Sequence, residues 1–438
     1  CRDSKRSSSV ITKDEFSKLD NDKIIDILEN YQEKENIGFS KRNDLVGEFQ
    51  QAIKANNFDW SYDIAKLLIR KSIFLDDIWY AILREWKDKE LDQQNKINIS
   101  HFLLYNEFLF KHHFEICEFL SKNAKDLVSN KESLALADNI RKVIFEDQSL
   151  GKVILNSELE EAFKEDESLD GSRNKNNQID WVTEATKSSG YYLCNFYIQC
   201  INKKDVQELD KLFLPFLENN SYSAKMGRAI VAFQLPHLFD INKEWTKKYI
   251  FPLFDWEESN ENASISWQSY LHNSNWNKKL YPELLELHKK SFTHFKGLGE
   301  ARQSYCYQIS ALALYGIIFD NKNPLEINWF QDFLGHCEAA DFNFFARGIL
   351  LNLSENKDVK DGIDNVWDKF LSRYLNNRKY CKPKNIKQSE FLTILDWGIC
   401  LNNQFSDFIK IIIEIDKENN ILNPHNPPQQ LGIMSDLA

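Results

Sequence analysis

The residues best suited to metal chemistry in this chain are its histidines. There are nine of them: His101, His112, His113, His237, His272, His288, His294, His336 and His425. A zinc or di-iron site in a helical protein needs Glu-x-x-His or His-x-x-x-His on one helix face, with a second such element opposite. The closest approaches are Glu286 with His288 and the pair His112-His113, and neither spacing brings two ligands together. His288 shares an apolar helical stripe with Leu284, which predicts a packed core histidine and no metal site.

Nucleophilic catalysis would need a Ser or Cys at a strained turn beside a base, and no Gly-x-Ser-x-Gly motif occurs. Gly297-Leu298-Gly299 has the glycine spacing of a phosphate loop. However, no strand pattern precedes it and no Gly-Lys-Ser/Thr follows. We therefore interpret this segment as the turn after a helix over residues 281–295, with Gly297 near the left-handed cap position.

Paired carboxylates, which could serve general acid–base catalysis, occur at several points. They are Asp76-Asp77, Glu160-Glu161, Glu165-Asp166-Glu167 and Glu257-Glu258. All lie in polar loops or at predicted helix starts, where acidic side chains complement the helix dipole. Asp255, between Phe254 and Trp256, is predicted to cap the turn before the next helix. We predict no catalytic residue and no cofactor site.

The charge balance argues against a general nucleic-acid binder. The net charge is −11 and the pI is about 5.5, whereas binding to the phosphate backbone requires a basic surface. The basic clusters are small: Lys41-Arg42, Lys247-Lys248 and three lysines within 382–387. We interpret these clusters as solvated loops and predict no nucleic-acid partner.

The cysteine pattern and the hydropathy indicate a cytoplasmic protein. The eight cysteines contain no Cys-x-x-Cys pair and stand among apolar neighbours, which predicts buried free thiols in a reducing compartment. No apolar run approaches the ~18 residues needed to span a bilayer, and no signal peptide is present. Because the chain starts at Cys1 rather than Met, we expect a piece trimmed from something longer.

Composition and periodicity predict helices throughout. Only 14 Gly and 9 Pro occur, and the first proline is Pro215, which disfavours β-structure rich in turns. A capping box at 12–15 opens a helix through Leu28, and residues 76–86 carry one broad apolar stripe. Residues 99–120 are apolar almost all round, as expected of a helix between two others. The β-branched run at 409–415 has helical flanks.

The predicted helices alternate with short loops at about 35–45 residues per helical pair, a spacing compatible with stacked helix hairpins. Neither the tetratricopeptide nor the ankyrin signature is present. We predict an all-α, irregular α-solenoid of stacked antiparallel helix pairs, similar in style to HEAT and tetratricopeptide arrays. The polar segment 164–178 is predicted to be an exposed loop between an N-terminal lobe (1–163) and a C-terminal lobe (179–438).

A solenoid works through its exposed faces, and aromatic side chains are frequent contacts there. The candidates in the C-terminal lobe are Trp267, Tyr270, Trp276 and Trp329. Aromatic residues make up 13% of the chain, as expected where helices pack without a deep central core. We therefore predict that these four side chains lie in the core.

Residues 227–432 resemble a helical C-terminal region, a domain of unknown function, in bacterial sirtuin-like anti-phage defence proteins. The similarity rests first on Gly227-Arg228-Ala229, Trp245, Pro252-Leu253-Phe254, Ala263, Trp267, Tyr270 and Leu271. It continues through Tyr281, Pro282, Leu284, Lys289, Phe292, Leu298-Gly299-Glu300, the 303–313 helix and Trp397. These are packing motifs, and the first ~180 residues match only in style.

The resemblance implies a sensing or regulatory region whose NAD-degrading module lies elsewhere. No glycine-rich dinucleotide loop or parallel-sheet pattern occurs in this chain. The first hypothesis is a non-catalytic sensor in anti-phage defence that binds a phage protein or its own effector module. The second is a generic helical adaptor unrelated to defence. The third is an enzyme with a cleft of scattered carboxylates between the lobes. Homo-oligomerisation is left open.

Overall fold

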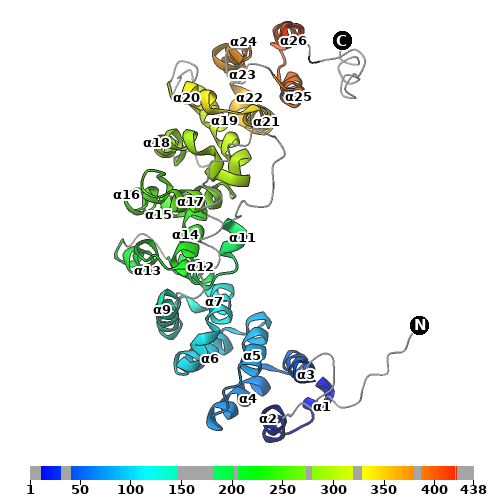
Figure 1. Cartoon of the computed structure of the whole chain (residues 1–438), viewed down its shortest axis with the longest axis vertical. Coiled ribbons are helices and arrows are strands. Elements are labelled where there is room, and N and C mark those ends of the chain that lie inside the picture. The colour runs from blue at the N-terminus through cyan, green and yellow to red at the C-terminus, as the bar shows by residue number, and fades with distance from the viewer. Residues whose placement is uncertain are drawn as a thin grey trace, which may run out of the picture. The chain divides into compact units, whose positions relative to one another are not determined.

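The computed structural model describes residues 11–30, 41–146, 181–201, 206–272, 279–318, 328–378, 386–419 and 421. These residues are 85% helical and form no β-strand, which confirms the all-α prediction (Figure 1). None of the helices in this described part has the length and apolar character to cross a bilayer. The predicted loop at 164–178 lies outside the described residues.

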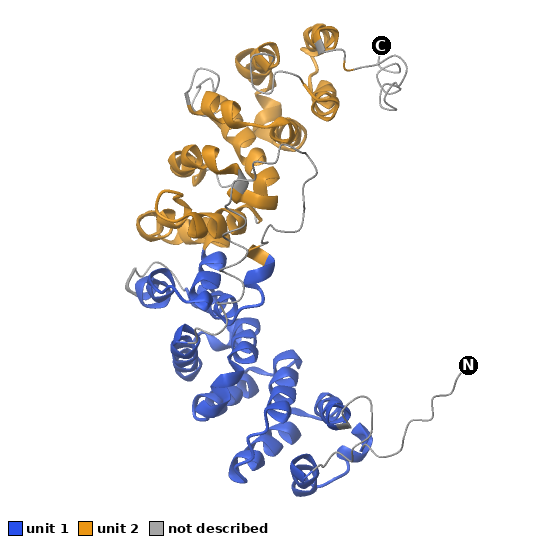
Figure 2. Cartoon of the chain, viewed as in Figure 1, with its two compact units in different colours: residues 1–156, 183–231 blue, residues 157–182, 232–438 orange. Residues whose placement is uncertain are grey.

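The helices form two compact units, called unit 1 and unit 2 below (Figure 2). Unit 1 comprises residues 1–156 and 183–231, and unit 2 comprises residues 157–182 and 232–438. The predicted boundary at 164–178 lies outside the described residues, and residues 183–231 group with the N-terminal helices. The reason is that the helix over 189–200 packs against helices of the first 146 residues.

Unit 1 is built from short helices joined by tight turns. They are α1 (Lys13–Phe16), α2 (Asn21–Asn30), α3 (Lys41–Ala55), α4 (Phe58–Arg70), α5 (Asp76–Asp88), α6 (Gln93–Leu104), η1 (Glu107–His112), α7 (His113–Lys122), α8 (Ala124–Leu127), α9 (Lys131–Glu146), α11 (Trp181–Ala185), α12 (Ser189–Cys200), α13 (Val206–Glu218) and α14 (Tyr222–Phe233). Helices α11 and α14 each cross a boundary between the two units.

Unit 2 continues the same style. Its elements are α15 (Leu235–Ile241), α16 (Lys243–Tyr249), η2 (Phe251–Phe254), α17 (Asn260–His272), α18 (Tyr281–Ser291), η3 (Phe292–Ala301), α19 (Arg302–Ile318), α20 (Asn328–His336), α21 (Ala339–Glu355), α22 (Lys357–Asp361), α23 (Ile363–Val366), η5 (Trp367–Leu371), α24 (Ser372–Asn377), α25 (Gln388–Trp397), η7 (Gly398–Cys400) and α26 (Phe405–Asn419).

Alternate helices contact one another along rows, which is the packing of a helical-repeat array. In unit 1, α1, α3, α5, α7 and α12 follow one another in one row, while α2 contacts α4 and α6 contacts α9. In unit 2, α17, α19, α21 and α25 form such a row. Each of these helices therefore buries one stripe against a later helix of the same row, as the periodicity of apolar residues requires.

Side-chain caps fix several helix starts. Asn57, Asp92 and Asn242 each precede a helix, and each accepts a hydrogen bond from the backbone N–H three residues later. The predicted capping box is present, since the Glu15 carboxylate accepts from the Thr12 N–H at 2.8 Å. Caps of this kind satisfy backbone donors that have no partner inside the helix.

Two predicted helices are interrupted in the structure. The helix opened by the capping box ends at Phe16 and α2 begins at Asn21, because a turn separates the two. The apolar stretch 99–120 is divided into α6, η1 and α7. The Asn106 side chain there bonds to the Phe102 carbonyl, and its backbone leaves the helical region with φ −128° and ψ 68°. The apolar pattern of this stretch therefore predicted its burial correctly but did not predict the turn at Asn106.

Candidate functional site

His288, the strongest candidate metal ligand in the sequence, lies in the core of unit 2. Its side chain is 0% exposed, and its ring centroid is 4.7 Å from that of Trp267 and 5.1 Å from that of Tyr305. Burial lowers its pKa to about 3, so the imidazole is neutral at physiological pH. The prediction of a packed core histidine is confirmed. Among the described residues, no three His, Cys, Asp or Glu side chains are placed to hold a metal ion.

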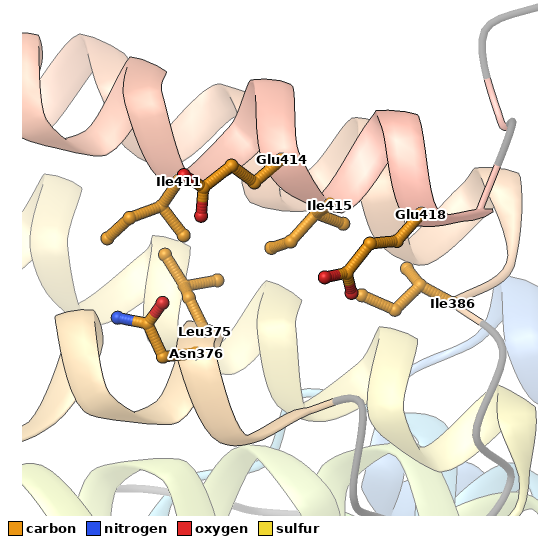
Figure 3. Close-up of a pocket in the computed structure, with 7 residues that line it drawn as sticks. All are labelled: Leu375, Asn376, Ile386, Ile411, Glu414, Ile415 and Glu418. Carbon is orange, nitrogen blue, oxygen red and sulfur yellow. The ribbon is translucent and has the colours of Figure 1, made fainter.

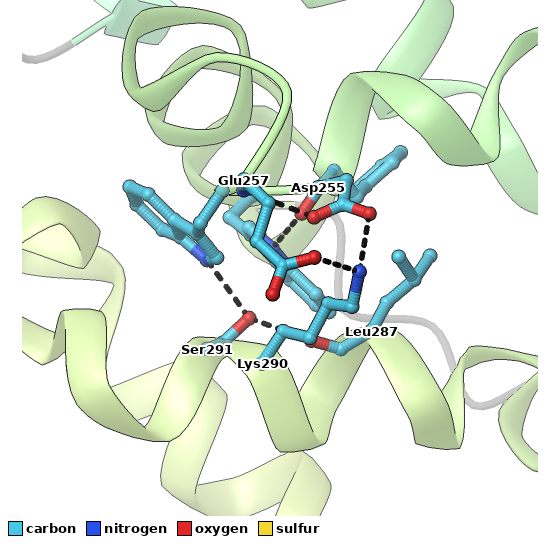
Figure 4. Close-up of polar contacts among 8 residues, drawn as sticks. Asp255, Glu257, Leu287, Lys290 and Ser291 are labelled. Atoms are coloured by element: carbon cyan, nitrogen blue, oxygen red, sulfur yellow. Dashed lines mark hydrogen bonds and ion pairs between the residues drawn. The ribbon is translucent and has the colours of Figure 1, made fainter.

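The carboxylates around Asp255 form ion pairs (Figure 4). Lys290 Nζ lies 2.7 Å from Asp255 Oδ2 and 2.6 Å from Glu257 Oε2, so one lysine joins α18 to the turn after η2. Asp255 Oδ1 also accepts from the Glu257 N–H at 3.0 Å, which confirms the predicted capping role. Next to this pair, the Trp256 indole N–H donates to Ser291 Oγ at 3.0 Å. The arrangement fastens α18 in place.

The glycine segment after α18 differs from its prediction. Helix α18 ends at Ser291 and is followed by the 3-10 segment η3, rather than running to residue 295. Gly299, not Gly297, has the positive φ of 53°. At Gly297 a Cβ atom would lie 2.5 Å from the Trp256 ring, so that glycine is required by close packing instead of by backbone conformation.

The described cysteines are not poised for nucleophilic chemistry. Six are free thiols, and all but Cys400 are buried, which confirms that part of the prediction. Burial raises the pKa of each described thiol, to about 12 for Cys200, so the reactive thiolate is scarce at neutral pH. Cys1 and Cys381 lie outside the described residues.

A shallow recess lies between α24 and α26 (Figure 3). It is lined by Leu375, Asn376, Ile386, Ile411, Glu414, Ile415 and Glu418. The floor is apolar, and the carboxylates of Glu414 and Glu418 stand near its rim. No histidine, cysteine, serine or cationic side chain is among the lining residues.

Exposed aromatic side chains gather in unit 1. Phe74, Leu75, Tyr105 and Phe108 are here called the aromatic edge. Phe74 is 48% exposed and Tyr105 68%, and the Phe74 ring packs edge-on against Phe108 with centroids 4.5 Å apart. The Phe74–Phe108 contact joins the turn before α5 to the start of η1, and Tyr105, at the end of α6, adds an exposed ring three residues before Phe108 in the chain. Surface aromatics that contact one another in this way mark binding surfaces more often than isolated ones do.

Local structure explains why Phe74 points outward. Ser72 adopts φ 59°, which turns the chain sharply after α4. The buried Trp79 indole N–H then donates to the Ile73 carbonyl at 3.1 Å and fixes the segment that carries Phe74. Trp79 also lies under Phe108, with ring centroids 5.6 Å apart. The edge is thus held by a rigid core contact, which lowers the entropic cost of binding a partner.

Charges of both signs border the aromatic edge. Lys111 pairs with Asp76, and His112 Nε2 lies 3.9 Å from the same carboxylate. The Lys111 hydrogen bond lowers the pKa of Asp76, and burial lowers the pKa of His112. An apolar centre with a mixed polar rim is the usual anatomy of a protein–protein interface.

The four aromatic residues considered as surface candidates were predicted to lie in the core. Trp267, Tyr270 and Trp329 are buried as predicted, and Trp276 lies outside the described residues. The exposed residues Phe74 and Tyr105 were not singled out. Their signal was available: each stands immediately outside a periodic apolar stripe, at a helix boundary, where packing does not require a large ring.

No protein-family model, curated protein or solved structure matches this chain. Inference about function therefore depends on the fold and surface of the chain itself.

Proposed function

We propose that this chain is a non-catalytic helical scaffold that binds a protein partner through the aromatic edge. The observation that carries the proposal is the contact between two part-exposed phenylalanines, Phe74 and Phe108, on a rigid turn. Aromatic side chains bury a large area at low entropic cost and dominate the energetics of interfaces.

The resemblance of residues 227–432 supports a proposal on the biological setting. We propose that the chain is the sensing or regulating part of a bacterial anti-phage defence protein, with any NAD-degrading module separate from it. Its partner would be a phage protein or that effector module. A generic adaptor would use the same edge, so the two readings differ only in which partner is bound.

Capture of partners from phage-infected and uninfected cells tests this proposal. The chain serves as bait beside the double variant Phe74→Ser/Tyr105→Ser. A matched control, Ile399→Ser/Ile413→Ser, makes the same kind of change at exposed apolar residues of unit 2. We expect a phage protein on the wild type and on the control but not on the edge variant. A partner shared by infected and uninfected cells would favour the generic adaptor, and equal recovery by all three baits would rule out the edge.

A further inference from the structure

Helix α18 occupies a central place in unit 2. It contacts η2, η3 and α20, and its buried face presents Leu284, His288 and Ser291. The His288 ring also packs against Trp267 on α17 and Tyr305 on α19. The packing of the buried face of α18 therefore depends on the contacts of the His288 ring with these two aromatic rings, which are called the cage below.

The cage leaves the imidazole without polar partners. Neither Nδ1 nor Nε2 of His288 has a hydrogen bond among the described residues. The neighbouring donors are directed to backbone carbonyls instead: Tyr305 Oη donates to the carbonyl of His288 at 2.8 Å, and Trp267 Nε1 to that of Phe254 at 3.0 Å. A neutral imidazole has one hydrogen-bond donor and one acceptor. When neither is paired, the lost hydrogen bonds to water make burial of the ring less favourable.

Further buried polar atoms of unit 2 are in the same condition. The hydroxyls of Ser266 and Ser269 on α17 and of Thr246 on α16 have no partner in the described part of unit 2. Most buried polar groups in proteins are paired, and exceptions often mark strained or functional segments. The unpaired ring nitrogens make the burial of His288 less favourable than its apolar contacts alone suggest.

Ion pairs hold α18 near both ends. Near its start, Glu283 pairs with Lys243 and Lys247 of α16, the latter with Nζ 2.8 Å from Oε2. Near its end, Lys290 pairs with Asp255 and Glu257 (Figure 4). The lysines are part-exposed, and ion pairs of this kind are weak and screened by salt.

We propose that α18 is an acid-sensitive latch: it separates locally from α17 and α19, and protonation of His288 in the separated state holds it open. This inference concerns unit 2 alone and does not depend on the aromatic edge of unit 1.

The change of the opening equilibrium with pH follows from the difference between the pKa values of His288 in the closed and open states. In the closed latch the pKa of His288 is about 3, whereas in water it returns to about 6.5. Between these values the open state binds a proton that the closed state rejects. Opening therefore becomes more favourable as the pH falls, by about tenfold between pH 7.5 and pH 5.5.

The titratable tyrosines on α17 and α19 and the ion-paired Glu283 of α18 itself do not reproduce this response. Burial raises the pKa of Tyr270 on α17 and of Tyr305 on α19, so both stay protonated over this range. Hydrogen bonds from Lys243 and Lys247 lower the pKa of Glu283, which therefore stays ionised.

At the other end, hydrogen bonds to Asp255 and Glu257 raise the pKa of Lys290, so its charge persists. On η3, His294 stacks on Trp256 with ring centroids 4.9 Å apart, and burial lowers its pKa. His294 is consequently the group whose contribution must be separated from that of His288.

Hydrogen exchange of the α18 amides at pH 7.5 and 5.5, corrected for the intrinsic rate, tests the latch. The whole chain is used as wild type and as His288→Leu, His294→Gln and His272→Gln, the last being an exposed histidine on α17. We expect protection of α18 to fall about tenfold in the wild type, His294→Gln and His272→Gln, and to stay constant in His288→Leu. His288→Gln, which also cannot titrate, replaces His288→Leu if that variant fails to fold.

Three results would overturn the proposal. The first is equal protection of α18 at the two pH values in the wild type. The second is a fall in protection that persists in His288→Leu, and the third is a fall that is abolished by His294→Gln.

Discussion

In unit 1, the indole N–H groups of Trp79 and Trp86 are buried on α5, and both reach oxygen acceptors. In unit 2, both ring nitrogens of His288 lack a partner, as do the hydroxyls of Ser266 and Ser269. A satisfied interior is rigid, whereas unpaired buried groups lower the free energy needed for local opening. The difference places the more labile interior in unit 2.

The surfaces differ in the opposite sense. Unit 1 places Phe74 and Tyr105 in solvent on a well-fixed turn, whereas the large apolar side chains exposed in the described part of unit 2 are the aliphatic Leu351, Ile399 and Ile413. A rigid aromatic surface favours binding, and a labile helix favours a change of conformation. We infer that the two units divide these roles between them.

The largest predicted change in the free energy of unfolding comes from breaking a buried ion pair in unit 2. Arg378 and Glu390 form a fully buried pair, with Nε to Oε1 at 2.7 Å, and the guanidinium lies over the Phe342 ring. Arg378→Leu leaves an unpaired buried carboxylate and is expected to lower the free energy of unfolding by about 3–5 kcal/mol. Urea denaturation measures it.

The matched control is Lys122→Leu, which breaks the exposed Lys122–Asp88 pair of unit 1. It should change stability little. Equal losses from the two variants would contradict the assignment of a buried ionic core to unit 2.

The next effect concerns the close packing of unit 1. At Gly190 on α12, a Cβ atom would lie 1.7 Å from the Ser223 carbonyl oxygen on α14. Gly190→Ala therefore forces the two backbones apart and is expected to cost about 3 kcal/mol in thermal or urea unfolding. Gly47→Ala meets nothing within 4 Å and should stabilise α3 by about 0.5–1 kcal/mol. A neutral Gly190→Ala would show that α12 and α14 are not in such contact.

The dependence of stability on pH separates the two interiors. The folded pKa of His288, about 3, lies below its unfolded value of about 6.5, so the unfolded chain binds more protons between them. Stability present at pH 7.5 is lost as the pH falls through 6.5 toward 3, by about 2 kcal/mol at pH 5. Urea denaturation of the wild type and His288→Leu at both pH values isolates this term. Identical pH dependence in both proteins would exclude His288 as its source.

The smallest effect on stability is expected at the aromatic edge. Phe74→Ser/Tyr105→Ser removes mainly exposed side chains and one ring contact, so unfolding should shift by less than about 1.5 kcal/mol. Circular dichroism during thermal unfolding measures the shift. A much larger loss would mean that the edge belongs to the core of unit 1 and is not a free surface.

The sequence predicted the parts of the molecule that depend on local periodicity. The stripe at 76–86 became α5, and the β-branched run near Ile412 became α26, because side-chain spacing alone decides which face is buried. The interruption after α6 was not predicted, since an apolar pattern reports burial and not the turn at Asn106. The role of Gly297 was also missed, because it depends on a contact with Trp256, 41 residues earlier in the chain.

The candidate site was less predictable than the fold. That His288 is buried could be inferred from its stripe, but the lack of partners for its ring depends on where Tyr305 and Trp267 direct their own donors. The exposure of Phe74 likewise depends on the φ of 59° at Ser72, which the residue pattern does not predict. Long-range packing decides both.

The most direct test of the account is the affinity of the purified partner for three forms of the whole chain. These are the wild type, Phe74→Ser/Tyr105→Ser in unit 1 and Ile399→Ser/Ile413→Ser in unit 2, compared by titration calorimetry. We predict that the dissociation constant rises at least about tenfold, the equivalent of about 1.4 kcal/mol, for the unit 1 variant alone. Unchanged affinity of that variant, or a loss confined to the unit 2 variant, would contradict binding through the aromatic edge.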